Sequence, residues 1–209
     1  MSRSVEDPFA GLISGRIVLM SVAAYCSAMS PCPSGESLDP PPAVIIQLME
    51  RIVSEQWPSG SEHFASYFAR LGCALGPPLE PDEEISLGLT RGQFVMPGAA
   101  VNASWSALNG ELFHLNLFAY AGEPDSSPDD VNAGYDAIRA GIADAFDPSP
   151  DERTDQRGNR SAVWFIQGTV IELYAHITEA PVLQTGVSHE GRTAKFHQLI
   201  ARSPEHPMQ

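Results

Sequence analysis

The sequence is poor in basic residues, and this shortage excludes two classes of partner. Twelve Lys and Arg stand against 26 Asp and Glu, which gives a formal net charge of -14 at pH 7. Nucleic acids and anionic membranes are bound through clustered Lys and Arg, so neither is expected as a partner. The acidic balance fits a cytoplasmic protein, or one that binds a basic partner.

Cysteines are also few. Cys26, Cys32 and Cys73 are an odd number without a short paired spacing, whereas a zinc site would need a CxxC-type pair and a matching second half. We therefore expect no metal and no other cofactor. We interpret Cys73 as a small buried residue near the end of a helix.

Motifs of the common enzyme classes are missing as well. The sequence contains no GxSxG, P-loop, GxGxxG, HExxH or zinc deaminase pattern. The acidic stretch 123–130 lacks the glycine that a calcium loop needs at its sixth position. These absences favour a protein without enzymatic activity.

The sequence also lacks apolar runs long enough to cross a membrane as a helix. The longest apolar run that it contains lies near the N-terminus. Ile17–Met29 has thirteen residues, which is too short for a membrane-spanning helix. We favour a disordered or non-native extension here. A signal peptide and a later translation start at Met20 or Met29 stay open as alternatives, and a signal peptide would make the protein secreted.

The composition then changes to that of a folded domain. Residues 30–42 are rich in Pro and Ser and predict a linker. The predicted organisation is a flexible extension over 1–42, a single α+β domain over 43–202 and a disordered tail over 203–209.

Within the domain, hydrophobic spacing separates helices from strands. Helices are predicted over 43–56, 59–72, 128–146 and 189–201. Strands are predicted over 84–90, 95–105, 112–121, 163–167, 169–178 and 182–188. Two local signals stand out: Ser127 and Pro128 begin the longest helix, and Asn109-Gly110 is the pair that a type I′ hairpin turn requires.

The order of these elements predicts the fold class. It reads α-α-β-β-β-α-β-β-β-α, with short turns between consecutive strands. We expect an α+β fold with an antiparallel meander of about six strands and helices mainly on one face.

The predicted strand 169–178 carries the clearest polar group. Glu172, Tyr174 and His176 alternate with apolar residues and should share one face, near polar residues of another strand. We predict that this face binds a partner, through His114, Asn116, Tyr120, Glu172, Tyr174, His176 and Gln184. A metal site, a general base with its orienting carboxylate, and plain solvent exposure are the alternatives.

Three motifs support a resemblance. They are W-x-x-x-G-x-x-I-E-L-Y-x-H from Trp164 to His176, V-L-Q-x-G-x-S-H from Val182 to His189, and G-Y-D-x-I from Gly134 to Ile138. Over about 43–201 the chain resembles small uncharacterised actinobacterial proteins regarded as immunity proteins of polymorphic toxins. Its element order is similar to that of type III secretion chaperones. The resemblance implies a stoichiometric binder without catalytic residues, whose acidic surface covers the active site of a toxin.

The first functional hypothesis is therefore a cytoplasmic, non-enzymatic protein that binds another protein, as an immunity-like or chaperone-like factor for a basic toxin. The second is a hydrolase or metal-dependent enzyme that uses Glu172, His176 and His114. The third is a secreted binding domain. A homodimer is left open.

Overall fold

The computed structural model describes residues 38–79, 88–99, 101–120, 127–147, 151–178 and 180–202. The apolar run 17–29, most of the predicted extension and the predicted C-terminal tail lie outside these ranges. No helix among the described residues is long and apolar enough to cross a membrane.

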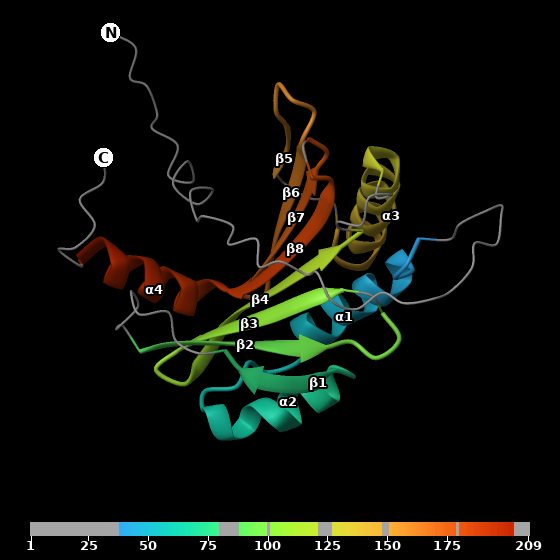
Figure 1. Ribbon diagram of the computed structural model, residues 1–209. Helices are drawn as coiled ribbons and strands as arrows, with labels where there is room; N and C mark the ends of the chain where they lie inside the picture. Colours follow the sequence, from blue (N-terminus) through green and yellow to red (C-terminus); the bar gives the residue numbers. More distant parts are fainter. Residues whose placement is uncertain are drawn as a thin grey trace, which may run out of the picture. The chain divides into compact units, whose positions relative to one another are not determined.

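The described residues form one antiparallel sheet of eight strands (Figure 1). The strands are β1 (Ala74–Pro78), β2 (Leu89–Val95), β3 (Asn102–Leu108), β4 (Glu111–Ala119), β5 (Asp151–Thr154), β6 (Arg160–Ile166), β7 (Thr169–His176) and β8 (Val182–His189). Their spatial order is β1-β2-β3-β4-β8-β7-β6-β5. Two meanders, β1 to β4 and β5 to β8, therefore meet where β4 pairs with β8.

Helices cover the two faces of this sheet unequally. They are α1 (Pro42–Ser54), α2 (Phe64–Arg70), α3 (Pro128–Phe146) and α4 (Glu190–Arg202), with one 3-10 turn, η1 (Ser61–His63), before α2. Helices α1 and α3 pack against each other and α3 packs on β7 and β8, whereas α4 leaves the end of β8 on the opposite side (Figure 1). The α+β class predicted from the sequence is confirmed.

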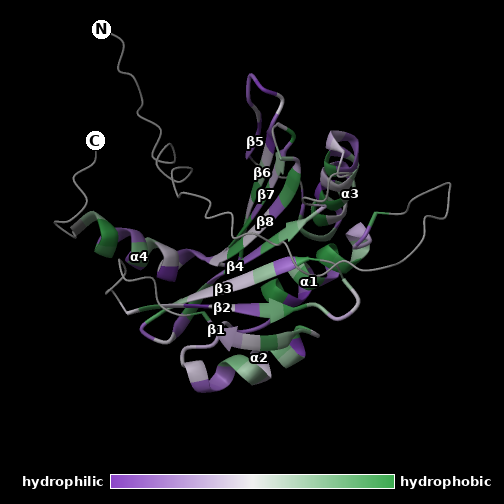
Figure 2. Ribbon diagram, viewed as in Figure 1, coloured by the Kyte–Doolittle hydropathy of each residue, from purple (hydrophilic) through white to green (hydrophobic). Residues whose placement is uncertain are grey.

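The hydrophobic core lies between the sheet and α1 to α3. Trp164 of β6, Leu173 of β7 and Leu117 of β4 are almost completely buried there, in the same cluster as Tyr135 and Ile138 of α3. Figure 2 shows hydrophobic and hydrophilic positions alternating along these strands, as expected for a sheet with one face covered.

Two local predictions are confirmed in detail. Helix α3 begins at Pro128 as predicted, and the Ser127 hydroxyl caps it by accepting a hydrogen bond from the Asp130 amide at 3.1 Å. The β3–β4 hairpin turns at Asn109 and Gly110, whose φ angles of 50° and 81° match the requirement of a type I′ turn.

The number of strands is corrected from about six to eight within the described part of the chain. Both additional strands, β1 and β5, are the edges of the sheet. Their sequences, ALGPP and DERT, contain the prolines and charges by which edge strands avoid further pairing, and such compositions resemble loops.

Strand β2 also begins later than predicted. It runs from Leu89 to Val95, and residues 84–87 lie outside the described part. A glycine at position 92 could be read from the sequence as part of a turn. In the structure the Trp105 indole of β3 lies directly over Gly92, and a Cβ atom on residue 92 would be within 2.6 Å of three atoms of that ring. The glycine therefore makes room for a core tryptophan inside a strand.

A β-bulge changes the facing of residues along β4. Ser106 of β3 pairs with His114, whereas the next residue, Ala107, pairs with Leu112, so Phe113 is the additional residue. As a result Leu112 joins the covered face together with Leu115, although strict alternation places them on opposite faces.

Candidate functional site

Strand β7 presents polar side chains on the face of the sheet opposite α3. Burial alternates strictly along the strand, with Ile171, Leu173 and Ala175 fully buried. The partly buried residues between and after them are Glu172, Tyr174 and His176. Successive side chains of a strand point to opposite faces, so these three share the face away from α3, as predicted from the sequence.

The three polar side chains of β7 restrain one another. The Tyr174 hydroxyl donates a hydrogen bond to Glu172 Oε1 at 3.1 Å. The rings of Tyr174 and His176 stack with their centroids 6.1 Å apart and an angle of 19° between planes. These contacts order the side chains before any ligand arrives, which lowers the entropy cost of binding.

Strands β8 and β4 continue this polar surface. Tyr174 stands beside Gln184, and Glu172 stands beside Gly186, which in turn pairs with Asn116 of β4. The Gln184 side-chain amide donates a hydrogen bond to Asn116 Oδ1 at 3.3 Å. We use the name polar face for the set formed by His114, Asn116, Glu172, Tyr174, His176 and Gln184.

Gly186 lies in the middle of the polar face, where the lack of a side chain lets Glu172 and His114 come close to the backbone of β8. A Cβ atom at this residue would lie 3.3 Å from Glu172 Oε2 and 3.5 Å from His114 Nε2. The carboxylate comes from β7 and the imidazole from β4, on either side of β8. We call this place, formed by Glu172, Gly186 and His114, the glycine contact.

Burial shifts the pKa values of these two groups in opposite directions. Loss of hydration raises the pKa of Glu172, and the hydrogen bond from Tyr174 and the charge of His197 partly offset this rise. Burial, with a smaller effect of the Arg91 charge, lowers the pKa of His114 to about 4. At neutral pH the glycine contact therefore pairs a neutral imidazole with a poorly solvated carboxyl group.

The enzyme hypothesis requires Glu172, His176 and His114 to converge, and the structure brings only two of them together. His176 lies four residues along β7 from Glu172, which corresponds to roughly 13 Å in an extended strand. Within the described ranges, no three His, Cys, Asp or Glu side chains form a group that could hold a metal ion.

Tyr120 does not belong to the polar face, although the sequence suggested that it would. It follows the end of β4, where its φ of 53° turns the chain, and its side chain is buried. The hydroxyl donates a hydrogen bond to the Pro40 carbonyl at 2.7 Å, and the ring packs against Gly134 of α3. Its role is to fix the start of α1 and the position of α3.

No protein-family model, curated protein or solved structure matches the chain. The polar face must therefore be interpreted from its own chemistry.

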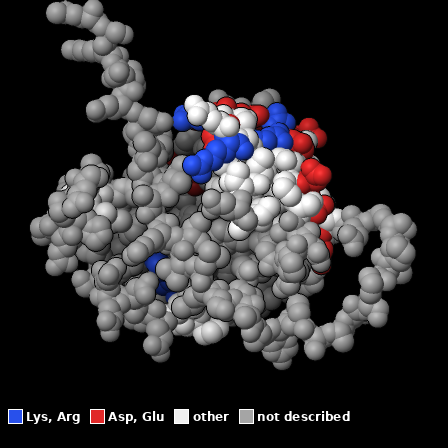
Figure 3. Space-filling view, turned by 45° about the horizontal axis from the view of Figure 1, so that its top comes forward, with Lys and Arg blue, Asp and Glu red and all other residues white. Residues whose placement is uncertain are grey.

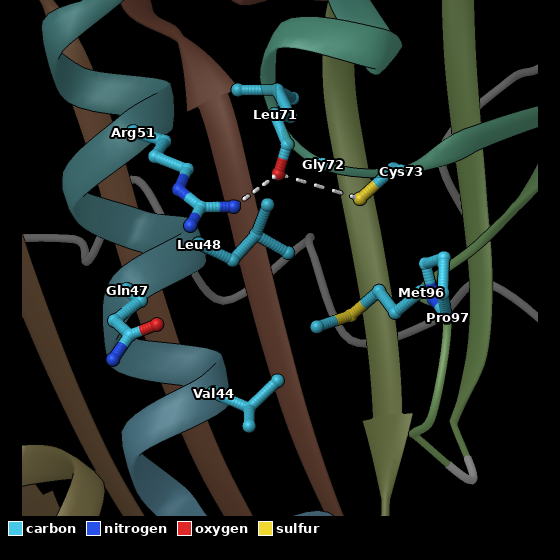
Figure 4. A pocket seen from close by; sticks show the side chains of 9 residues that line it. All are labelled: Val44, Gln47, Leu48, Arg51, Leu71, Gly72, Cys73, Met96 and Pro97. Atoms are coloured by element: carbon cyan, nitrogen blue, oxygen red, sulfur yellow. Dashed lines mark hydrogen bonds between the residues drawn. The ribbon is translucent and has the colours of Figure 1, made fainter.

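A separate depression lies between α1, the end of α2 and the end of β2 (Figure 4). Its volume is about 120 Å³, and Arg51 at its rim donates a hydrogen bond to the Leu71 carbonyl at 2.9 Å. The Cys73 thiol lines it, but burial raises the pKa of this thiol to about 11. A thiol that stays protonated at neutral pH is a poor nucleophile, so this depression is a weaker candidate than the polar face.

Sequence reasoning missed two features of the site. The sequence marks Gly186 only as the glycine of the V-L-Q-x-G-x-S-H motif, because its place in the site depends on the side chains that flank it on β7 and β4. Arg192 of α4 was also missed: its guanidinium donates hydrogen bonds to the Pro58 and Leu112 carbonyls, both at 2.7 Å, and fixes the start of α4. The strand register, which the sequence does not give, would have been needed to find both.

Proposed function

We propose that this chain is a non-enzymatic protein-binding factor that holds a basic partner protein on its polar face. The observation that supports this most is the ordered row on β7, in which Glu172, Tyr174 and His176 are half-buried and held by mutual contacts. Polar side chains fixed in this way suit recognition of a partner's surface, because little freedom is lost when it docks.

The composition of the sheet edges favours docking on a face over addition of a strand. At one edge, β1 contains Pro77 and Pro78, which have no amide hydrogen to donate to a new strand. At the other edge, three of the four residues of β5 are charged, and Arg153 pairs with Asp151 at 3.0 Å. Both features disfavour the strand addition by which many peptides are bound.

Apolar anchors flank the polar face on the same side of the sheet. Phe165 of β6 and Val95 of β2 are each 57% exposed. Each stands next in sequence to a buried core residue, Trp164 and Phe94 respectively, so its own side chain points away from α1 to α3. Exposed apolar residues beside ordered polar ones are typical of interfaces, where aromatic anchors contribute much of the binding energy.

The charge of the chain indicates the chemistry of the partner. A net charge of -14 accelerates association with a basic protein and slows association with an acidic one. On the surface seen in Figure 3, acidic and basic groups lie side by side around an uncharged area. A basic toxin neutralised in the cytoplasm, as by an immunity-like factor, is the partner that we propose.

The test is complex formation with the products of the adjacent genes. Each is co-expressed with the full chain, and complexes are measured at low and high salt by size-exclusion chromatography with light scattering. We expect a one-to-one complex with a basic protein that associates more slowly as salt rises. Failure to form a complex with any basic neighbour at low salt would contradict the proposal.

A charge-matched pair of variants separates the polar face from general attraction. Glu172→Lys and Glu50→Lys change the net charge equally, but Glu50 lies on the exposed side of α1. We expect Glu50→Lys to slow association alone, whereas Glu172→Lys should also accelerate dissociation at least tenfold. Equal effects of the two substitutions would show that the partner docks elsewhere.

A further inference from the structure

The depression between α1, the end of α2 and the end of β2 has a polar rim. Gln47 and Arg51 stand one turn apart on α1 and both line it (Figure 4). Within the described ranges, the Arg51 guanidinium donates one hydrogen bond, to the Leu71 carbonyl, and the Gln47 amide donates none. A guanidinium and an amide together carry several N–H donors, so most donors of this rim can bind a ligand.

The Arg51 guanidinium is held in place without a counter-charge. Gly72 follows α2 with a φ of 78°, and a Cβ atom on it would lie 2.6 Å from Arg51 Nη1, so glycine leaves room for the guanidinium. The carboxylate of Glu55, one turn later on α1, pairs with Arg70 at 2.7 Å. In the part of the chain that the structure describes, Arg51 itself forms no ion pair.

The floor of the depression is apolar, and its volume limits the size of a ligand. Leu48, Leu71 and Met96 line it and are each at most 5% exposed. Val44, Leu48 and Arg51 lie on one side of α1 and face Met96 across the depression (Figure 4). A cavity of about 150 Å³ holds the roughly six heavy atoms of benzene, so the volume of about 120 Å³ found here suits roughly five.

We propose that this depression binds a carboxylate group on a short carbon chain, held at the rim by Arg51 and Gln47. The planar guanidinium matches the two oxygens of a carboxylate, and the amide adds a further donor. Arg51 is the one cation among the described residues that line the depression, so a single negative charge matches it better than a doubly charged phosphate. The site lies apart from the polar face and does not depend on the proposed function.

The test uses the full chain labelled for NMR, with sodium propionate as the probe. The Met96 methyl group and the Arg51 Nε–H group report on binding, and sodium chloride at equal ionic strength is the reference. We expect saturable shifts at both groups, with a dissociation constant in the millimolar range. Propionamide has the same shape without the charge and should bind the wild type at least about tenfold more weakly.

A matched pair of variants assigns the binding to Arg51. Arg51→Gln removes the cation from the rim and should weaken propionate binding at least about tenfold, with the Met96 methyl group as reporter. Arg70→Gln removes the same charge from the neighbouring helix, at an exposed residue that does not line the depression, and should leave binding unchanged.

A second probe distinguishes the two sources of such a carboxylate, a free small acid and an acidic side chain of another protein. The probe is glutamate blocked at its amino and α-carboxyl groups, which leaves only the side-chain carboxylate. Tighter binding of blocked glutamate than of propionate would assign the site to a protein side chain, and weaker binding would assign it to a free acid.

Three outcomes would overturn the inference. They are propionate shifts no larger than those with sodium chloride, equal binding of propionamide and propionate, and equal losses of binding in Arg51→Gln and Arg70→Gln. If Arg51 served only to cap the end of α2, Arg51→Gln would lower stability while the wild type bound no probe. The comparison of propionate with propionamide needs no variant, so it decides the question even if Arg51→Gln fails to fold.

Discussion

The two faces of the sheet use the same strands for different purposes, and β7 shows the contrast residue by residue. On the covered face, Ile171, Leu173 and Ala175 are fully removed from water by α3 and its neighbours. On the other face, Glu172 and Tyr174 form one hydrogen bond and stay partly exposed. The first set stabilises the fold through apolar burial, which contributes about 25 cal/mol per Å².

The polar face gains little stability from its contacts. A neutral hydrogen bond contributes about 1 kcal/mol net, and burial of a carboxyl group opposes folding when its pKa is raised, as for Glu172. Side chains that are fixed but contribute little to stability are better explained by recognition than by folding. If this comparison is right, adjacent substitutions on β7 should have very different effects.

The largest expected difference is the one between Leu173→Ala and Tyr174→Phe in the free energy of unfolding. Leu173→Ala removes buried methyl groups and leaves a cavity, so the free energy of unfolding should fall by about 2–5 kcal/mol. Tyr174→Phe removes one hydroxyl and its hydrogen bond to Glu172, which should cost about 1 kcal/mol or less. Urea unfolding of both variants, followed by circular dichroism, measures the two values. Similar losses would mean that the polar face is part of the stabilising structure.

A second difference between the two faces should appear in how folding stability depends on pH, because His114 of the polar face titrates. His114 has a pKa of about 4 in the folded chain, against roughly 6.5 when unfolded. Between these values the unfolded chain binds a proton that the folded chain does not, so stability decreases as the pH falls from about 7 to 4. The contribution of His114 is at most about 3 kcal/mol, because one pKa unit corresponds to 1.36 kcal/mol.

The effect of His114 must be separated from two other groups. The pKa of His189 is also lowered, chiefly by burial and then by Arg192, and acts in the same direction. The raised pKa of Glu172 acts in the opposite direction, because its contribution is lost as the pH rises. The contribution of His114 alone is the difference between the wild type and His114→Gln in the pH dependence of the free energy of unfolding. An imidazole signal of His114 that titrates near pH 6.5 would contradict the prediction.

The sequence predicts the covered face better than the polar face, and the reason is physical. Core elements carry a periodic pattern that their own residues create, so α3 and the alternation of β7 could be predicted locally. Edge strands carry no such pattern. The prolines of β1 and the charges of β5 prevent pairing with a further strand. Loops have the same composition, so a single sequence does not show that these two segments are strands.

The glycine contact could not be predicted at all from local patterns. It depends on the pairing of β4 with β8, two strands separated by more than sixty residues of chain, and on their register. A one-residue shift of that register would place Gly186 on the covered face and remove the contact. Conversely, Tyr120 has a sequence position that fits the polar face, but the chain turns after Ala119 and buries it.

The smallest expected effect concerns α4, which lies on the same side of the sheet as the polar face. Phe196 packs on Phe113 with ring centroids 4.9 Å apart, while Leu199 and Ile200 are each 38% exposed. The helix is therefore held mainly at its first turns, where Arg192 donates to three carbonyls outside the helix. Attachment at one end predicts that α4 can open while the covered face stays folded.

Arg192→Lys tests this local attachment. Lysine keeps the charge but has one nitrogen in place of the two that donate to the Pro58, Leu112 and Trp57 carbonyls, so α4 should lose about 1–2 kcal/mol of local stability. Hydrogen exchange should accelerate about five- to thirtyfold in the α4 amides and remain unchanged in β7. The control is Lys195→Met, one turn later on the exposed side of α4. If β7 exchanged faster too, α4 and the covered face would unfold together, and the division between the two faces would fail.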